Sequence, residues 1–496
     1  MEKIKSSPFI SFWSFLGLGA MIIIWFLPWR FQVNDDEIMM WLVSGAYTGT
    51  PESYAVFIHP ILSWIFSKLY TFVPIVPWYP LTWFLVMYLA YVVFLIQITL
   101  KCSTFWTKLS WALFLFGLFI HFLFFLQFSI VAAFAIAAGL SKRFELGRTN
   151  SANWYKIYPS DLLILAGLLI RQEVPMLIFI GMLGLNVLVF RENRIYRALL
   201  IPIIFLAFSY SLTVLSTDHE FRKLNQLRSS VFDHPVLQLN KEDFKESHPE
   251  LYHYSNGLID FEEVPDLAFK LREWKVFLNS ERTRQYTLPS IYTSLHTYIE
   301  HETFLVSIMV FFIAFTLFGK SKKQLIVLIL LAAVLVLLSP FYLIKVQIYA
   351  ILFLLYFLIS LDKSPEGSLP VYLSRSIGTL LVLGICFHFF SYTKSSENFP
   401  SSQKLKNQLK NLKAEGIDEV VLIAAGEVYH ELVFDNPLPF QVLGWPTLLV
   451  RSSQLDSLSS RAYLVDSATY ANNASYFKGM INQPSTCDQV LLISNE

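Results

Sequence analysis

The chain has 496 residues, of which 55% are hydrophobic and 15% charged, with a formal net charge of +1. This balance lies outside the range of soluble globular proteins and predicts a protein that crosses a membrane many times. No basic block indicates a nucleic-acid partner, and the three scattered cysteines support neither a disulfide framework nor a zinc site.

Long apolar segments follow one another along most of the chain. About 30 Å of hydrocarbon has to be crossed, so the shorter segments would be half-helices or lie where the bilayer is thinned. The first segment lacks a cleavage site and is expected to remain as a helix. About eleven transmembrane helices are expected, at residues 9–29, 79–100, 109–125, 127–141, 160–171, 174–190, 197–216, 303–319, 323–339, 342–361 and 373–393.

Lysine and arginine concentrate in alternate short loops, which sets the expected orientation. The N-terminus is then cytoplasmic, provided that residues 60–73 do not cross the bilayer. This stretch carries Ser63 and Ser67 on one helical stripe and Ile61 and Ile65 on another. The pattern is typical of a helix lying in the membrane interface, so we expect a juxtamembrane helix on the outer face.

The expected fold is an all-α polytopic membrane domain with outer juxtamembrane helices and a small extracytoplasmic α/β domain. The last part rests on a Lys-rich amphipathic pattern at 403–415 and on strand-like runs at 419–424 and 490–493. Four regions are expected: an N-terminal transmembrane module at 1–216 with a first outer loop at 30–78, a large outer loop at 217–302, further transmembrane helices at 303–393, and the C-terminal domain at 394–496.

An acidic run follows the first apolar segment and contains Asp35, Asp36 and Glu37. A helix start would account for one or two of these carboxylates, because Asn34 or Asp35 can cap and Glu37 suits the helix dipole. It would not account for three. Carboxylates are costly this close to hydrocarbon, so their excess indicates a functional site.

This segment resembles the first outer loop of the GT-C superfamily of membrane glycosyltransferases, which includes protein O-mannosyltransferases, aminoarabinose transferases of lipid A and oligosaccharyltransferases. Asp36 and Glu37 match the acidic dipeptide that follows the first transmembrane helix in that superfamily. Residues 38–46 and 61–73, the latter preceded by His59 and Pro60, resemble its two juxtamembrane helices. Asp35 is an additional acid, and the family's His-Pro-Pro pattern reads His-Pro-Ile here.

The resemblance implies transfer of one sugar from a polyprenyl-phosphate donor to a cell-envelope acceptor, a glycan, lipid or protein, at the outer face of the cell membrane. Such a donor carries an activated leaving group, so the protein has to supply mainly a base and cations for the phosphate. We expect Asp36 to be the base, with Asp35 as its rival and Glu37 as a supporting acid. No cofactor is expected, although the same acids leave a divalent metal open as an alternative.

Arg171 and Lys345 are the expected phosphate ligands, because each lies at the outer end of an apolar segment. The alternatives are a hairpin tip with an Arg171–Glu173 pair, and a Lys345 that extends to the lipid headgroups. Four further side chains are candidates for substrate binding: His59, Gln127 in an outer turn, and Arg228 and Asp233 in the large outer loop, where a solvated loop face is the alternative.

Two rival functions remain open besides a non-catalytic scaffold. A transporter or flippase of lipid-linked sugars would place charged residues near the bilayer midplane and often show two related halves. The chain has neither feature. A polysaccharide polymerase would use the same kind of site with a longer donor.

Overall fold

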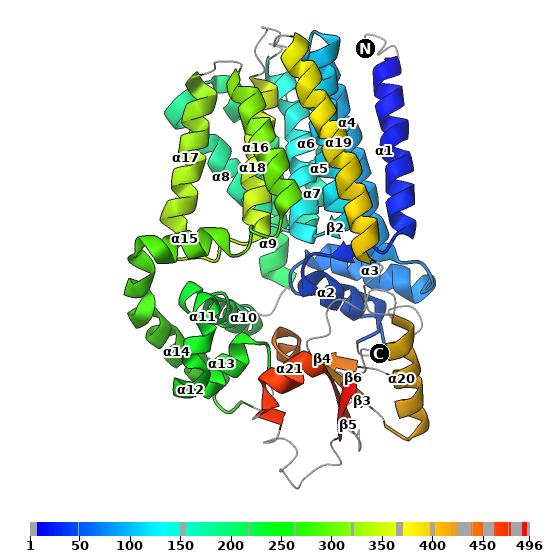
Figure 1. Cartoon of the computed structure of the whole chain (residues 1–496), viewed down its shortest axis with the longest axis vertical. Coiled ribbons are helices and arrows are strands. Elements are labelled where there is room, and N and C mark those ends of the chain that lie inside the picture. Colours follow the sequence, from blue (N-terminus) through cyan, green and yellow to red (C-terminus); the bar gives the residue numbers. More distant parts are fainter. Residues whose placement is uncertain are drawn as a thin grey trace.

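The computed structural model describes residues 7–47, 49–148, 155–216, 219–261, 264–318, 322–363, 371–396, 402–417, 419–423, 438, 440–449, 461–474, 476–477 and 489–493. Helices lying side by side form its main body (Figure 1). They are α1 (Pro8–Phe26), α4 (Trp78–Lys101), α5 (Phe105–Phe124), α6 (Phe128–Arg148), α7 (Asp161–Ile170), α8 (Glu173–Leu185) with its π-helical extension η1 (Asn186–Phe190), α9 (Asn193–Ser216), α16 (Thr303–Phe318), α17 (Lys322–Leu338), α18 (Val346–Asp362) and α19 (Val371–Ser396).

Each apolar segment of the sequence overlaps one of these helices. Six helices of the described residues are long and apolar enough to cross a membrane, namely α1, α4, α5, α8 with η1, α9 and α19. Helices α7, α16 and α18 are apolar but shorter. The prediction of an all-helical membrane domain is therefore confirmed at this level.

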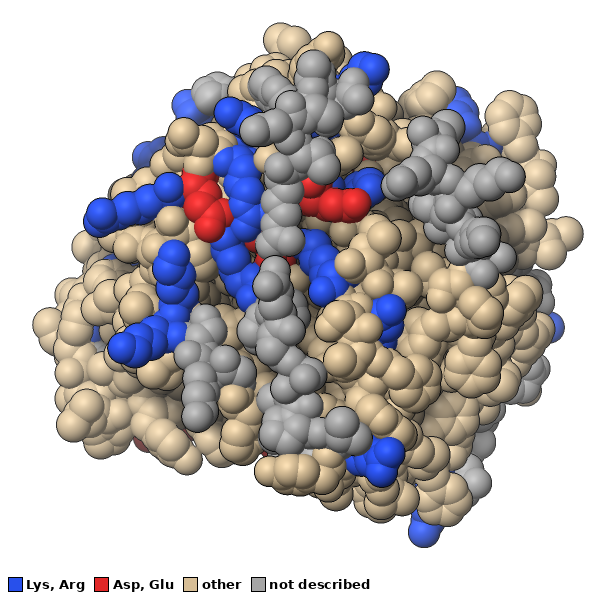
Figure 2. All heavy atoms as spheres, turned by 90° about the horizontal axis from the view of Figure 1, so that it is seen from above, with Lys and Arg blue, Asp and Glu red and all other residues tan. Residues whose placement is uncertain are grey.

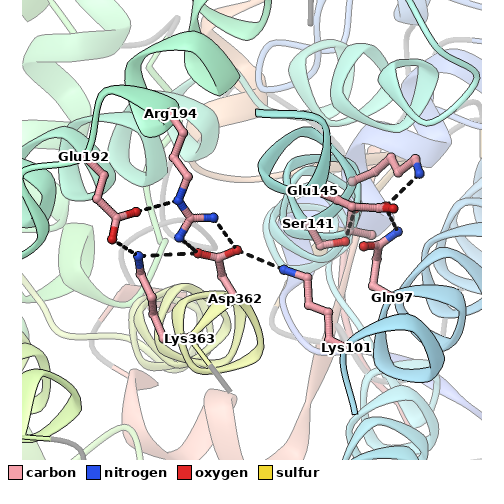
Figure 3. A network of polar contacts seen from close by, with 10 residues as sticks. Gln97, Lys101, Ser141, Glu145, Glu192, Arg194, Asp362 and Lys363 are labelled. Atoms are coloured by element: carbon pink, nitrogen blue, oxygen red, sulfur yellow. Dashed lines mark hydrogen bonds and ion pairs between the residues drawn. The ribbon is translucent and has the colours of Figure 1, made fainter. Parts of the chain in front are cut away.

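The bundle has two different ends, which we call the loop end and the cap end. Short connections join the helices at the loop end, and lysine and arginine side chains are spread over this face (Figure 2). Several of them form buried ion pairs. Asp362 accepts hydrogen bonds from Lys101 at 2.9 Å and from Arg194 at 2.7 Å, and Lys363 contacts Glu192 (Figure 3).

This network joins the last residue of α18 to α4 and α9. The side chain of Asp362 is only 4% exposed. A buried charge is tolerated when it is paired, and removing its partner is strongly destabilising. The network therefore fixes the loop end of α18 relative to its neighbours.

Two helices, α2 (Asn34–Ser44) and α3 (Pro60–Phe72), lie across the cap end of the bundle (Figure 1). The serine stripe of α3 faces inward, because Ser63 and Ser67 are buried. Trp64 and Phe72 are 53% and 79% exposed. An exposed apolar face at this level is what an interfacial helix requires.

A turn at Gly45 ends α2. Its φ of +86° is strained for any residue with a side chain, and a β-carbon there would lie 2.8 Å from the backbone nitrogen of Pro51. Glycine is therefore required both by conformation and by space. The turn sends the chain back over the end of α2 toward α3.

Beyond α2 and α3, a group of mostly short helices covers part of the cap end. Their own apolar core includes Leu237, Leu251 and Leu271. The group consists of α10 (His219–Phe232), α11 (Pro235–Leu239), η2 (Lys241–Asp243), α12 (Phe244–Ser247), α13 (Pro249–Ser255), α14 (Leu267–Glu281), η3 (Arg282–Tyr286) and α15 (Leu288–His296).

The C-terminal region adds a small parallel sheet with strand order β4-β3-β5-β6. The strands expected at 419–424 and 490–493 are confirmed as β3 and β6, and the Lys-rich pattern forms α20. The elements are α20 (Ser402–Ala414), β3 (Glu419–Ile423), β4 (Phe440–Val442), η5 (Trp445–Leu448), β5 (Arg461–Asp466), α21 (Ser467–Asn472) and β6 (Gln489–Ile493). A separate two-residue parallel ladder pairs β1 (Arg30–Phe31) with β2 (Phe125–Leu126) and so ties the end of α1 to the α5–α6 turn.

Candidate functional site

A cavity of about 250 Å³ lies at the cap end, between the bundle and the segments that cover it. Its wall is built from α2, the α5–α6 and α7–α8 turns, α10, the residues before α18, and the segment between β4 and η5. Six of the nine residues expected at the site line this cavity: Asp35, Gln127, Arg171, Arg228, Asp233 and Lys345.

Asp35 is the acid of the run that faces the cavity. Its Oδ1 accepts a hydrogen bond of 3.0 Å from Nε1 of Trp445, which lies 410 residues further along the chain. Burial raises the pKa of Asp35, and the positive charges of Lys345 and Arg228 only partly oppose this effect. The result is a carboxylate of increased basicity beside cations.

Lys345 lies just before α18 and pairs with Asp233, whose Oδ1 is 2.8 Å from Nζ. Asp233 also accepts a hydrogen bond of 2.9 Å from Ser229. Burial alone would raise the pKa of Asp233, but Lys345 and Ser229 outweigh it and hold that pKa below its usual value. The pair is therefore ionised at neutral pH. Asp233 is the partner of Lys345, the cation that was expected to bind phosphate.

Arg171 lies in the α7–α8 turn. It pairs with Glu173 at 2.9 Å, as the hairpin alternative proposed. Its guanidinium also lies 5.3 Å from the ring of Phe57 and 5.0 Å from that of Phe128, on the cavity wall. The two rings hold the planar cation by cation–π contact, while its Nε pairs with Glu173.

Arg228 reaches the same cavity from α10 and is 5% exposed. Its Nη2 donates a 2.9 Å hydrogen bond to Oδ1 of Asn225, an uncharged partner. Gln127 is 1% exposed, and its Oε1 has no hydrogen-bond partner among the described residues. The cavity wall thus includes a buried cation and a buried acceptor that a ligand can satisfy.

Asp36, the expected base, does not line this cavity. It is fully buried and accepts hydrogen bonds from Tyr79 Oη at 2.9 Å, Trp83 Nε1 at 3.3 Å and the backbone N–H of Phe128 at 3.1 Å. Burial raises the pKa of Asp36 and these hydrogen bonds lower it, with a net rise to about 8. Asp36 thus joins α2 to α4 and to the first residue of α6, whereas Asp35 is the acid of the run that lines the cavity.

His59 and Glu37 also lie away from the cavity. The Nδ1 of His59 accepts from the backbone N–H of Ile61 at 3.1 Å and caps α3, while Nε2 lies 3.2 Å from the carbonyl oxygen of Ser209. Burial lowers the pKa of His59, so the ring is neutral. Glu37 is buried in α2.

A second cavity, of about 370 Å³, adjoins the first. Asp233 and Lys345 line both cavities, so their ion pair is part of the partition between the two. The second cavity is also lined by Gln32, Tyr298 and Leu343.

Trp445 and Phe57 line the cavity but were not expected there from the sequence. Trp445 donates to Asp35 and packs against Phe57, with ring centroids 4.9 Å apart. Its position, between a glycine and a proline in a turn after a strand, was the only signal available in the sequence. That signal does not say which acid the indole contacts.

The three carboxylates of the acidic run lie in different surroundings and are not placed together as ligands of one metal ion. Within the described residues, no group of three or more His, Cys, Asp and Glu side chains is placed to hold a metal ion. The cavity instead combines two carboxylates, Asp35 and the Lys345-paired Asp233, with three cations, an arrangement suited to anion binding and proton transfer.

No protein-family model, curated protein or solved structure matches the chain. Fold and site together define a helical membrane protein with a charged cavity at one end of its bundle.

Proposed function

We propose that the chain is an integral-membrane glycosyltransferase of the GT-C type, which transfers a sugar from a polyprenyl-phosphate donor to a cell-envelope acceptor. The observation that carries the proposal is the placement of Asp35 in one cavity with Lys345, Arg228 and Arg171, at the end of a membrane bundle. In this proposal about eleven helices lie in the cell membrane, the shorter ones as half-helices or where the bilayer is thinned. The loop end is cytoplasmic, and the cap end with the C-terminal sheet is extracytoplasmic.

The chemistry follows from the charges in the cavity. The oxygen of the acceptor hydroxyl attacks the anomeric carbon, and Asp35 accepts the proton of that hydroxyl. The bond from the anomeric carbon to the phosphate oxygen breaks. The electron pair stays on the leaving polyprenyl phosphate, whose growing negative charge is stabilised by Lys345, Arg228 and Arg171. The raised pKa of Asp35 makes it a stronger base than an exposed aspartate.

The test is sugar transfer from a labelled polyprenyl-phosphate sugar by purified protein in detergent. Asp35→Asn is expected to lower kcat by about 10²–10⁴-fold, because general-base catalysis contributes on that order. Asp243→Asn is the matched control, since Asp243 is exposed on the covering helices. Asp36→Asn should retain more activity than Asp35→Asn.

Undiminished transfer by Asp35→Asn would refute the assignment of the base. Absence of transfer in the wild type, together with movement of the lipid-linked sugar across vesicles, would replace the enzyme with the flippase. Products that grow by many sugars per event would indicate the polymerase.

A further inference from the structure

An apolar groove of about 800 Å³ runs along the membrane-facing side of the bundle between α1, α5 and α19. Phe12 and Leu16 of α1 form one wall, Leu113 of α5 contributes to the floor, and Leu383 of α19 belongs to the other wall. These three helices are all of membrane-crossing length and composition. A groove so placed opens to lipid, and Phe12 is accordingly 62% exposed.

One cation lies at the loop end of this groove. Arg375 belongs to the first turns of α19, and its guanidinium lies 4.6 Å from the ring of Trp106 at the start of α5. Both side chains line the groove. A tryptophan and an arginine at this depth are typical of the boundary between hydrocarbon and headgroups.

Arg375 differs from the three cations of the buried network at the loop end, each of which has an acidic partner. Lys101, Arg194 and Lys363 are paired with Asp362 or Glu192 (Figure 3). Over the described part of the chain, no carboxylate contacts Arg375. Among the described residues, then, no carboxylate neutralises the charge of Arg375.

A buried hydroxyl gives a second, independent observation. Ser374 lines the groove and is 2% exposed, and its Oγ has no hydrogen-bond partner among the described residues. An unsatisfied buried hydroxyl is costly and rare in native structures. A ligand oxygen beside Arg375 would satisfy it.

The length of the groove fits a lipid chain. Its wall on α19 extends from Ser374 to Cys386. At 1.5 Å per residue, these positions are roughly 18 Å apart along the helix axis, close to the reach of one extended acyl chain.

We propose that this groove is a binding site for one anionic glycerophospholipid of the loop-end leaflet, with an acyl chain between α1 and α19 and the phosphate at Arg375 and Ser374. The charge of Arg375 selects an anionic over a zwitterionic headgroup. The site is separate from the cavity at Asp35 and does not depend on the proposed enzymatic activity.

Cys386 supplies a probe inside the groove. The chain has three cysteines, so Cys102→Ser with Cys487→Ser leaves this exposed thiol as the only one. Its maleimide alkylation is measured in detergent micelles with increasing phosphatidylglycerol or phosphatidylcholine. Phosphatidylglycerol is expected to give half-protection at about one tenth of the mole fraction that phosphatidylcholine needs, as one charge-assisted contact implies.

Two variants and one control complete the test. Arg375→Gln should remove the preference for phosphatidylglycerol, whereas Lys323→Gln, an exposed cation at the same end, should retain it. Gly378→Leu should fill the groove, since a β-carbon at Gly378 meets only Leu113 at 3.6 Å. Native mass spectrometry should then find less retained phosphatidylglycerol in Gly378→Leu than in the parent.

The melting temperature of each variant in lipid-free detergent is first shown to equal that of the parent. Misfolding is then not mistaken for loss of binding. Equal protection by both lipids in the parent would overturn the proposal. So would a preference that survives Arg375→Gln, or full lipid retention by Gly378→Leu.

Discussion

Asp36→Asn tests whether Asp36 is a buried structural acid, which would set it apart from Asp35 at the cavity. The usual pKa of this carboxyl is 3.8, and burial raises it to about 8 in the folded chain. Between these values the unfolded chain has released the proton and the folded chain still holds it. The free energy of unfolding therefore falls as the pH rises from about 4 to about 8.

The magnitude follows from about 1.4 kcal/mol for each pH unit between the two pKa values. Raising the pH from about 5.5 to about 7.5 should thus cost the wild type about 2–3 kcal/mol through Asp36 alone. Asparagine does not titrate and lacks this dependence. At the lower pH it should be less stable by about 1–3 kcal/mol, because its amide cannot accept from all three donors.

The assay is denaturant unfolding in detergent at both pH values, for wild type, Asp36→Asn and the exposed Asp243→Asn. The difference in stability between wild type and Asp36→Asn should shrink or reverse at the higher pH, while Asp243→Asn should follow the wild type. A difference that stays constant with pH would refute the conclusion that Asp36 is neutral and structural.

Three further predictions concern stability and substrate binding. Asp362→Ala should lower the free energy of unfolding by about 3–5 kcal/mol, because it leaves buried cations unpaired. Lys142→Met, at a more exposed ion pair, should cost about 1 kcal/mol or less; equal losses would contradict the role of the network. Gly45→Ala should destabilise more than Gly49→Ala, since both have φ near +85° but only Gly45 has backbone within 3 Å of the added carbon; equal melting temperatures would show that the turn can relax. Lys345→Met should raise KM for a polyprenyl-phosphate sugar at least about tenfold, as one charged contact implies, with Lys223→Met as the exposed control; an unchanged KM would remove Lys345 from phosphate binding.

The sequence was sufficient to predict the apolar helices of the bundle, but not the short helices between residues 219 and 296. Apolar segments are long enough to specify their helices by composition alone, and six of the expected site residues meet in one cavity. Helix α3 was identified because its polar and apolar residues form separate stripes.

The choice between Asp35 and Asp36 could not be made from the sequence. Neighbours in a helix point about 100° apart, so the rotation of α2 decides which acid faces the cavity. That rotation is fixed by Tyr79, Trp83 and the first N–H of α6, none of which is near in sequence. Trp445 was missed for the same reason, because a contact across 410 residues leaves no local pattern.

In the Lys345–Asp233 pair, the carboxylate of Asp233 competes with any incoming anion for Lys345. Any incoming anion has to displace a carboxylate that is already 2.8 Å from the lysine and ionised at neutral pH. Weakly binding anions such as chloride will not make this exchange, whereas a group with several charged oxygens gains Arg228 and Arg171 as well. The fold thereby sets a threshold on the charge of any anion that binds at Lys345.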